Sequence, residues 1–493
     1  MIILGTNSIK DTGFNVANSC RFNDGDSAYM HKTPGSSGNR RKFTFSCWIK
    51  KGDIAPGDDT CLFSGDNSGD DSRPDDIRIR DTGKLYVSFR NTNDGIVSTK
   101  RVLRDPSAWM NIVVAVDTEQ STAENRVKIY INGVQESNLE GDGSGSPTYP
   151  SEDHDCTGFG RDTKITVGAR SKDSPDKFFD GYMAEVCYID GSQLAATSFG
   201  EFDEDSPTIW KPKDVSGLTF GTNGFYLDFE DSSNLGNDAN GGTDLTEVNL
   251  AATDQASDSP TNNFMTLNPL IGTTSYTDNQ VYSEGNTIVI PNSTDNYGTA
   301  FGTFGATKGK WYWEAQIIWN GTSTNANYPR TIGFMRDDYA FNQSTLGQNA
   351  DNSWGVGFAD LSTDGWGLDH NGSFSAITGA TTLADDKMLM FALDLDNGKF
   401  YMGYNGTFFT SGDPTSGATG TGAIATLTAT DLSKFIIPAV TNATNSTYYK
   451  FNFGNPAYTI SSGNSDAEGH GNFEYAVPSG YFALNTKNLA EYG

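Results

Sequence analysis

The stretch MLMFALDLDNGKFYMGYNGTFF, residues 388–409, contains two Asn-Gly pairs, and each pair is flanked by apolar runs. Because Asn and Gly both tolerate positive φ, an Asn-Gly pair between apolar runs is a strong short-range signal for a β-hairpin. The stretch therefore predicts three strands with turns at residues 397–398 and 405–406. The stretch RVKIYINGVQ, residues 126–135, gives a similar signal far upstream.

The overall composition favours the same architecture. The 493 residues include 55 Gly, 12% aromatic residues and only 19% charged residues, whereas 36% are apolar. Abundant Gly and aromatic residues with few helix formers are typical of all-β domains with many turns. The length corresponds to two or three domains.

The first half alternates apolar and polar residues with the period of a half-buried strand. RKFTFSCWIKK at 41–51 and KLYVSFR at 84–90 show this pattern, and WMNIVVAVD at 109–117 is the near-continuous apolar run of a strand buried on both faces. Polar loops separate these segments. We expect one domain over residues 1–200, a sandwich that includes a short N-terminal arm.

The second half predicts another antiparallel sandwich, over residues 271–493. KWYWEAQIIW at 310–319 places three Trp residues on one face of a strand, and further short apolar segments follow. Residues 201–270 between the two halves are acidic, punctuated by Pro and mostly small and polar. The apolar patch at 225–229 indicates that this connector is structured and packs along its neighbours.

The formal net charge of −28 excludes some classes of partner. A chain this acidic is repelled by phosphate backbones and by anionic lipid, so we expect neither nucleic-acid binding nor membrane insertion. The apolar run after Met1 has three residues, which is too short for a signal peptide, and no stretch has the length of a membrane span. The charge suits a particle surface or a protein that holds cations.

Two acidic loops are candidate metal sites. NDGDS supplies Asp24 and Asp26, and SGDNSGDDSRPDD supplies Asp66, Asp70 and Asp71. Ca²⁺ prefers six to eight oxygen ligands, and closely spaced carboxylates repel one another without a cation. No cofactor is required by the sequence, and a bound Ca²⁺ is one alternative. The other is that these are solvated acidic loops.

One segment of the second half could contact a ligand. SWGVGFADLSTDGWGLDHNG places Trp354 and Trp366 near Asp369, His370 and Asn371. An exposed aromatic plane beside carboxylates or amides suits a sugar. Alternatively, both Trp side chains belong to the core, and the three polar residues form only a turn.

Nothing in the sequence matches a known catalytic pattern. The nearest approach to the paired carboxylates of a glycosidase is GEFDEDS, with Glu201, Asp203 and Asp205, and this segment lacks strand periodicity. Only four His residues occur, and neither G-x-S-x-G nor H-E-x-x-H is present. The five Cys residues have no metal-ligand spacing, and a disulfide framework is not expected. We expect no enzymatic activity.

Ordered sets of motifs resemble two known families. FTFSCWIKK, SAWMNIVVAVDTEQ, RVKIYINGVQ, ITVGAR and FFDGYMAEVCYIDG resemble the laminin-G/concanavalin A-like lectin superfamily. GKWYWEAQI, TIGF, WGVGF, DGWGL, MLMFALDLDNGKFYMGYNGTFF, IIPAV and FNFG resemble the SPRY family. The resemblance implies two β-sandwiches and makes residues 388–409 scaffold. In SPRY relatives the loops at one end bind partners, and here these loops correspond to residues 319–330, 337–352 and 411–430.

Longer phrases are similar to virion proteins of marine tailed phages. These phrases include DTGFNVANSCRFNDGDSAYMHKTPGSSGNRRKFTFSCWIKKG, SFGEFDEDSPTIWKPK and DSPTNNFMTLNPL. The resemblance implies a protein that is made in the host cytoplasm and lies on the virion surface. It would be a tail fibre or appendage that contacts other virion proteins and host-surface glycans, and we expect a homo-oligomer. A capsid decoration or tail structural protein without a host ligand is the alternative, and a polysaccharide depolymerase is the third.

Overall fold

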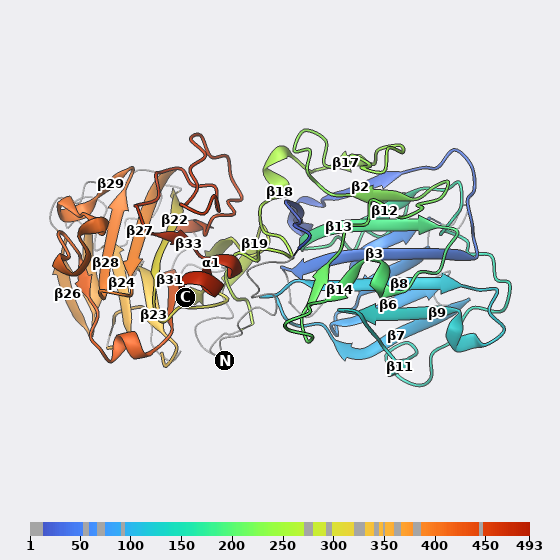
Figure 1. Cartoon of the computed structure of the whole chain (residues 1–493), viewed down its shortest axis with the longest axis horizontal. Coiled ribbons are helices and arrows are strands. Elements are labelled where there is room, and N and C mark those ends of the chain that lie inside the picture. Colours follow the sequence, from blue (N-terminus) through green and yellow to red (C-terminus); the bar gives the residue numbers. More distant parts are fainter. Residues whose placement is uncertain are drawn as a thin grey trace. The chain divides into compact units, whose positions relative to one another are not determined.

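The computed structural model describes residues 13–52, 59–66, 74–89, 94–270, 280–291, 298–319, 331–339, 345–348, 351–358, 366–377, 386–442 and 447–493. The chain divides into two compact units, residues 11–262 and residues 263–493 (Figure 1). We call them the first and second units. Within each, the described strands form sheets that enclose an apolar core, and all of them pair antiparallel except one two-residue strand at 482–483, which pairs parallel. The predicted all-β class with two antiparallel sandwiches is confirmed.

The first unit contains two large sheets, named here after a central strand of each. The β3 sheet consists of β1 (Ser19–Phe22), β3 (Lys42–Lys51), β8 (Met110–Asp117), β9 (Val127–Ile131), β10 (Val134–Gln135), β13 (Gly181–Asp190), β16 (Phe225–Leu227) and β18 (Gln255–Ala256). The β5 sheet consists of β2 (Tyr29–Lys32), β4 (Thr60–Gly65), β5 (Asp75–Ile79), β6 (Lys84–Phe89), β7 (Gly95–Val102), β11 (Leu139–Glu140), β12 (Ile165–Val167) and β17 (Thr246–Val248). A separate hairpin and four short 3₁₀ helices complete the unit: β14 (Gly200–Phe202), β15 (Trp210–Pro212), η1 (Asp24–Asp26), η2 (Ala123–Asn125), η3 (Ala196–Ser198) and η4 (Ala252–Asp254).

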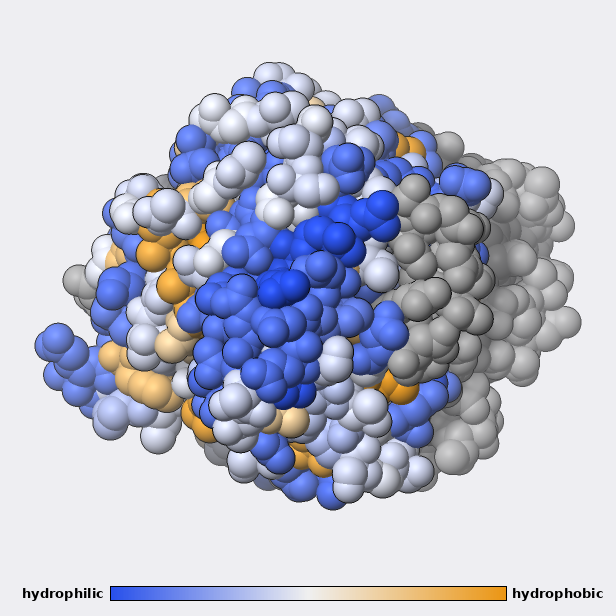
Figure 2. Space-filling model, turned by 90° about the vertical axis from the view of Figure 1, so that its right-hand side faces the viewer, coloured by the Kyte–Doolittle hydropathy of each residue, from blue (hydrophilic) through white to orange (hydrophobic). Residues whose placement is uncertain are grey.

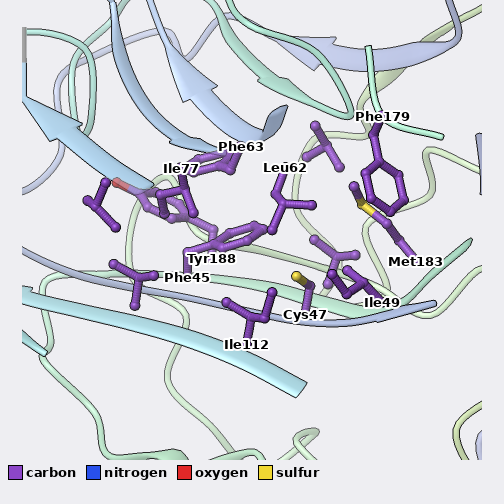
Figure 3. Close-up of a cluster of buried hydrophobic side chains, with 14 of the residues drawn as sticks. Phe45, Cys47, Ile49, Leu62, Phe63, Ile77, Ile112, Phe179, Met183 and Tyr188 are labelled. Atoms are coloured by element: carbon purple, nitrogen blue, oxygen red, sulfur yellow. The ribbon is translucent and has the colours of Figure 1, made fainter. Parts of the chain in front are cut away.

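The core of the first unit forms between these two sheets. In β3 the alternating residues Phe45, Cys47 and Ile49 point inward, as their spacing predicts, and all three are fully buried. Figure 3 shows these side chains facing Leu62 and Phe63 of β4 across the core. Cys47 is therefore a buried thiol, and all five cysteines are buried and unpaired, so the structure contains no disulfide framework, as expected.

The predicted connector contributes strands to this unit. β16 pairs with β13, β17 pairs with β2, and β18 pairs with β1, so residues 225–256 extend both sheets. The boundary between the two compact units falls between residues 262 and 263, whereas the sequence placed the end of the connector at residue 270. The apolar residues at 225–229 are explained by this pairing, because Phe225 and Leu227 enter the core.

The second unit also contains two sheets. The β22 sheet consists of β19 (Gln280–Ser283), β20 (Ile288–Pro291), β22 (Lys310–Trp319), β27 (Lys387–Asp394), β28 (Lys399–Tyr404), β29 (Thr407–Phe408), β30 (Ala425–Thr426), β32 (Thr447–Asn452) and β33 (Phe482–Ala483). The β24 sheet consists of β21 (Gly298–Phe301), β23 (Thr331–Arg336), β24 (Ser353–Phe358), β25 (Trp366–His370), β26 (Ser373–Ala376) and β31 (Ile436–Asn442). The helices are η5 (Phe409–Ser411), η6 (Pro414–Thr419), η7 (Asp431–Ser433) and α1 (Thr486–Tyr492).

The three predicted strands within residues 388–409 are β27, β28 and β29, which confirms their role as scaffold. Asn405 and Gly406 form a two-residue turn with φ values of 49° and 87°. The first connection is longer, because Asp394 pairs with Lys399 and four residues separate the strands. Of those four residues only Gly398 has positive φ, so the left-handed position that favours Gly is still used.

Buried carboxylates attach segments without regular structure to these sheets. In the second unit, Glu314 on β22 is fully buried and accepts hydrogen bonds from the backbone N–H groups of Glu474 and Tyr475, at 2.9 and 2.8 Å. The hydroxyl of Tyr312 donates to the same carboxylate at 2.8 Å. Asp466 accepts from the backbone N–H of Ala483 at 2.9 Å. The long segment after β32 is therefore held by hydrogen bonds to two buried carboxyl groups.

The first unit has a comparable anchor at Asp258, which lies in the segment that ends the unit. Lys50 Nζ on β3 is 2.7 Å from Asp258 Oδ2, and Trp109 Nε1 donates to Asp258 Oδ1 at 2.8 Å. Ser19 Oγ donates to the backbone carbonyl of Asp258 at 2.6 Å. The Lys50 and Asp258 side chains are 1% and 0% exposed, so neither charge can be solvated if its partner is removed.

A β-bulge in β13 places a carboxyl group in an unusual position. The register of β13 against β3 shifts between Ala184 and Cys187, and Glu185 within the shift has φ of 50°. Its buried side chain accepts a hydrogen bond from Tyr226 Oη at 2.8 Å. Burial raises the pKa of Glu185 to about 8, with nearby carboxylates adding to the effect.

We predict that Asp258→Asn lowers the free energy of unfolding by about 3–5 kcal/mol, because it removes the carboxylate that pairs with the buried Lys50 ammonium at 2.7 Å. Chemical denaturation of the intact chain measures this change. Asp155→Asn is the control, because it breaks an exposed ion pair with Arg41 and is expected to change stability by less than about 1 kcal/mol. A loss below about 1 kcal/mol for Asp258→Asn would contradict the anchoring role.

We predict a pH-dependent gain in stability for Glu185→Gln. The folded chain holds a proton on Glu185 up to a pKa of about 8, whereas the unfolded chain releases it near pH 4.5. The wild-type protein therefore loses stability relative to the Gln variant as the pH rises from about 4.5 through 8. Denaturation curves at pH 4, 6 and 9 should show a difference that grows by a few kcal/mol; a constant difference would rule out the raised pKa.

Candidate functional site

The face of the β5 sheet that points away from the apolar core carries many polar side chains, and most of these side chains are buried. In β5 the sequence DDIRI turns Ile77 and Ile79 toward the core, so Asp76 and Arg78 point to the opposite face. In the neighbouring β6 the same alternation places Tyr86 on the outer face between inward-facing apolar residues. The polar side chains therefore share one face because the strands have a period of two.

Strand register arranges these side chains in two rows across the sheet. One row runs through Ser88, Asp76, Ser64, Thr166 and His31, and each residue pairs with the next across adjacent strands. The second row runs through Ser98, Tyr86, Arg78 and Cys61. We call these two rows together the polar face.

Ion pairs link charged residues on the polar face and at its margin. Arg78 lies 3.5 Å from Asp76 and 3.4 Å from Asp59, so one guanidinium contacts two carboxylates. Arg80 lies 3.2 Å from Asp59 and 2.8 Å from Asp142. Arginine and carboxylate groups therefore alternate along this part of the face, and each charge has a partner.

The Tyr86 ring lies close to two guanidinium groups. The Arg78 and Arg80 guanidinium carbons are 4.5 and 4.9 Å from the ring centroid, within cation–π range. Burial raises the pKa of the Asp76 carboxyl, although Arg78 and the Ser88 hydroxyl oppose this. Among the described residues, Asp76 Oδ2 is buried and accepts no hydrogen bond. Because Asp76 is 0% exposed, this oxygen is out of reach of a ligand hydroxyl group.

The opposite end of the polar face is aromatic and more open. Tyr29 and His31 lie on β2, with ring centroids 5.8 Å apart, and the Phe178 ring is 6.1 Å from that of Tyr29. All three side chains are only partly buried. Burial and then the Lys164 charge lower the pKa of His31, so its imidazole is neutral at neutral pH. Aromatic planes beside hydroxyl and carboxylate groups suit a polyhydroxylated ligand.

The two predicted ligand-contacting Trp residues lie in the core of the second unit. Trp354 on β24 and Trp366 on β25 are each 2% exposed. Trp354 is stacked between Phe334 and His370, with centroid distances of 4.9 and 4.6 Å. Their burial favours the alternative in which both rings are core residues, because neither offers an open plane to a sugar.

The structure brings the predicted residues Asp369, His370 and Asn371 together at one hairpin. Asp369 and His370 end β25 and are partly buried, and Asn371 forms the exposed turn before β26, with φ of 49°. Burial raises the pKa of the Asp369 carboxyl. His370 Nδ1 lies 3.0 Å from the backbone carbonyl of Ser353, so the ring is fixed by stacking and by this contact. Turn chemistry accounts for Asn371 at this position.

The candidate metal residues do not converge where the structure describes them. Asp24 and Asp26 lie in the exposed helix η1, and Asn23 Nδ2 donates to Asp26 Oδ2 at 2.9 Å. Asp66 follows β4 and is partly buried, whereas Asp70 and Asp71 lie outside the described residues. Within the described ranges there is no group of three or more His, Cys, Asp or Glu residues that could hold a metal ion.

The best sequence approximation to a pair of catalytic carboxylates is occupied by local contacts. Glu201 on β14 lies 3.7 Å from Lys211, and Asp203 lies 3.3 Å from the same amine. Asp203 also accepts hydrogen bonds from the backbone N–H groups of Asp205 and Ser206, at 3.1 and 2.8 Å, which closes a turn. This arrangement serves the hairpin and leaves no facing pair of carboxyl groups.

Of the predicted SPRY-type loops, residues 411–430 are described in full. Helix η6 in this segment begins at Pro414 after the N-cap residue Asp413, and β30 pairs with β28, so the loop packs on the β22 sheet. Residues 320–330, 340–344 and 349–350 of the other two loops lie outside the described residues.

Comparison with known proteins supports the lectin-like resemblance of the first unit. The family described as the Concanavalin A-like lectin/glucanases superfamily matches residues 24–196. No curated protein matches the chain. No helix in the described part of the chain combines the length and apolar character needed to cross a membrane.

Several solved structures are similar to parts of the chain. The SPRY domain of human HERC1 is 15% identical, with 33% of this chain and 86% of that chain covered and a TM-score of 0.23. The TRIM65 PSpry domain is also 15% identical, with coverages of 38% and 91% and a TM-score of 0.26. A heptameric SAP-like pentraxin from Limulus polyphemus is 12% identical, with coverages of 37% and 80% and a TM-score of 0.25.

We predict that Trp354→Ala lowers the free energy of unfolding by about 3–5 kcal/mol, because it removes a buried ring that is stacked on two neighbours. Thermal or chemical denaturation measures this loss. Ser373→Ala, on the exposed strand β26, is the control and is expected to change stability by less than about 0.5 kcal/mol. A Trp354→Ala chain of unchanged stability would indicate a contact role instead of a core role.

Proposed function

We propose that the chain is a non-enzymatic component of a phage virion that attaches to host-surface glycans through its lectin-like first unit. The observation that carries this proposal is the aromatic end of the polar face, where the rings of Tyr29, His31 and Phe178 are partly exposed. The rows of hydroxyl and carboxylate side chains behind these rings are buried and support them from within the sheet. Stacking on aromatic planes and hydrogen bonding to a few fixed polar groups is a general way to bind a sugar. The family match to residues 24–196 supports a lectin-like role.

The virion location is proposed from the sequence phrases shared with marine tailed-phage proteins. On a virion surface, many copies of the chain would present the same face, and weak affinity for one sugar would be raised by multivalency. Other virion proteins would be the second class of partner. Neither nucleic acid nor membrane lipid is proposed as a partner, because the net charge of −28 opposes both. Ca²⁺ remains an additional ligand to test, and no cofactor is required.

A non-enzymatic role is supported by the pairing of the acidic groups on the polar face. Glycoside hydrolysis needs one carboxyl group as an acid and a second as a base or nucleophile, on opposite sides of the sugar bond. Asp59 and Asp76 both pair with the same guanidinium, that of Arg78, so neither is an unpaired carboxyl group that faces a second one across a cleft. The depolymerase alternative would need a second, unpaired carboxyl group on this face.

One observation agrees with the alternative of a capsid decoration or tail structural protein. The arginine and carboxylate groups of the polar face already pair with one another, as they would in a network that only stabilises the sandwich. The face of the chain in Figure 2 is mainly hydrophilic, with hydrophobic residues in small patches. This one face gives no support to a large apolar packing interface upon it, so we favour attachment.

The proposal is tested with a glycan microarray of bacterial surface polysaccharides probed with the labelled intact chain. We predict that Tyr29→Ala and Phe178→Ala each weaken binding to the recognised glycan at least about tenfold, which corresponds to about 1.4 kcal/mol of lost contact. Tyr130→Ala is the matched control, because it removes a partly buried ring from the β3 sheet. If all three variants bind the glycan as tightly as the wild-type chain does, the binding site lies elsewhere. Absence of binding to any glycan by the wild-type chain would favour the structural alternative.

A further inference from the structure

Strand β26 forms an exposed edge of the β24 sheet in the second unit. The order of the described strands is β21-β31-β23-β24-β25-β26, and all four residues of Ser373–Ala376 are exposed. The Phe374 side chain is 47% exposed, which makes it one of five exposed large apolar side chains among the described residues. An exposed strand at a sheet edge presents backbone N–H and C=O groups that can pair with another strand.

The register identifies which backbone groups point outward. The Ile377 N–H donates to the Trp366 carbonyl at 2.8 Å, so 366 and 377 form a hydrogen-bonded pair. Hydrogen-bonded and non-bonded pairs alternate along an antiparallel ladder, so residues 375 and 373 also bond toward β25. The N–H and C=O groups of Phe374 and Ala376 therefore point away from the sheet. Neither residue has a hydrogen-bond partner among the described residues.

The edge lacks the features that usually prevent pairing. Natural edge strands are protected by charged side chains, Pro or bulges, whereas Ser373–Ala376 contains none of these and pairs with β25 without a register shift. This neutral sequence stands in a chain with a net charge of −28. Two copies could therefore approach at this strand without placing like charges opposite each other.

The hairpin is held in position before any partner arrives. Gly372 in the turn donates its N–H to the Gly347 carbonyl at 2.9 Å. The Phe374 ring lies over Gly367, where a Cβ atom would come within 1.9 Å of the ring. Only Gly at position 367 leaves room for this ring, so the exposed aromatic side chain has a fixed place on the outer face of the sheet. A preorganised edge loses less conformational entropy on pairing.

We propose that β26 is the interface of a two-fold homodimer, in which the β26 strands of two copies pair antiparallel and join two β24 sheets. With the two-fold axis at Ser375, Phe374 of each copy lies opposite Ala376 of the other. Both residues direct their backbone groups outward, so the two symmetry-related pairs can each form two hydrogen bonds. An isologous contact of this kind closes on itself and does not extend into a filament.

Side-chain sizes agree with this register. Phe374 and Ala376 lie on the same face of the strand, and the two-fold axis places each large ring opposite a small methyl group. The two Phe374 rings become diagonal neighbours, about 7–8 Å apart between backbones, which is within reach of aromatic side chains. The interface is small, so the dimer would be weak in solution. A virion that carries many copies would strengthen it by multivalency.

The test measures the mass of the intact chain by analytical ultracentrifugation at increasing concentration. We expect the wild-type mass to rise toward twice the monomer mass, and we expect Ala376→Pro to remain monomeric. Pro at 376 removes an outward N–H and leaves the ladder to β25 intact, because Ala376 does not bond toward β25. Phe374→Asp is the second variant, because it places like charges near the two-fold axis and is also expected to remain monomeric.

Val281→Asp is the matched control, since Val281 is 46% exposed on β19, the edge strand of the β22 sheet. It should associate as the wild type does. Circular dichroism confirms that each variant is folded, and Phe374→Asp decides the question if Ala376→Pro does not fold. A wild-type chain that stays monomeric up to millimolar concentration would overturn the proposal. Association that survives both β26 variants, or that is lost in Val281→Asp alone, would also overturn it.

Discussion

Buried carboxylates that accept hydrogen bonds from extended segments are the interactions on which both units depend. Each unit encloses a core between two sheets, but much of its chain runs outside the sheets without regular structure, and its backbone N–H groups need partners. Asp258 in the first unit and Glu314 and Asp466 in the second satisfy such groups or attach such segments. Because an unpaired buried charge is expensive, these contacts also fix where each segment lies.

The same use of carboxylates positions the polar face. Asp75 and Asp76 are neighbours on β5, and the strand turns them to opposite sides. The Asp75 carboxylate accepts the backbone N–H groups of Gly158 and Phe159, at 2.7 and 3.1 Å, and so secures a loop. Asp76 faces outward and contacts Arg78. These buried contacts hold the sheet rigid behind the partly exposed rings of Tyr29, His31 and Phe178, and recognition of a ligand requires such fixed positions.

The sequence predicted the fold well because strand periodicity and Asn-Gly turns are local signals. Alternation at residues 41–51 identified β3, and the turn at residues 405–406 lies where it was predicted.

The candidate sites were harder to predict, because they depend on pairing between distant strands. Trp354 could be a core residue or a contact residue by sequence, and only its stacking in the fold favours the core. Alternation in DDIRI and KLYVSF could have placed Arg78 and Tyr86 on one face, but their proximity depends on the register of β5 and β6.

The most direct measurement for the proposed attachment function is a cryo-electron map of the phage particle that encodes this chain, with the chain located in it. Attachment requires that the aromatic end of the polar face be open to solvent at the particle surface. We expect the map to show the chain on the outside of the virion with Tyr29, His31 and Phe178 accessible. A map in which this face is buried against capsid or tail neighbours, or in which the chain is absent from the particle, would contradict the proposed function.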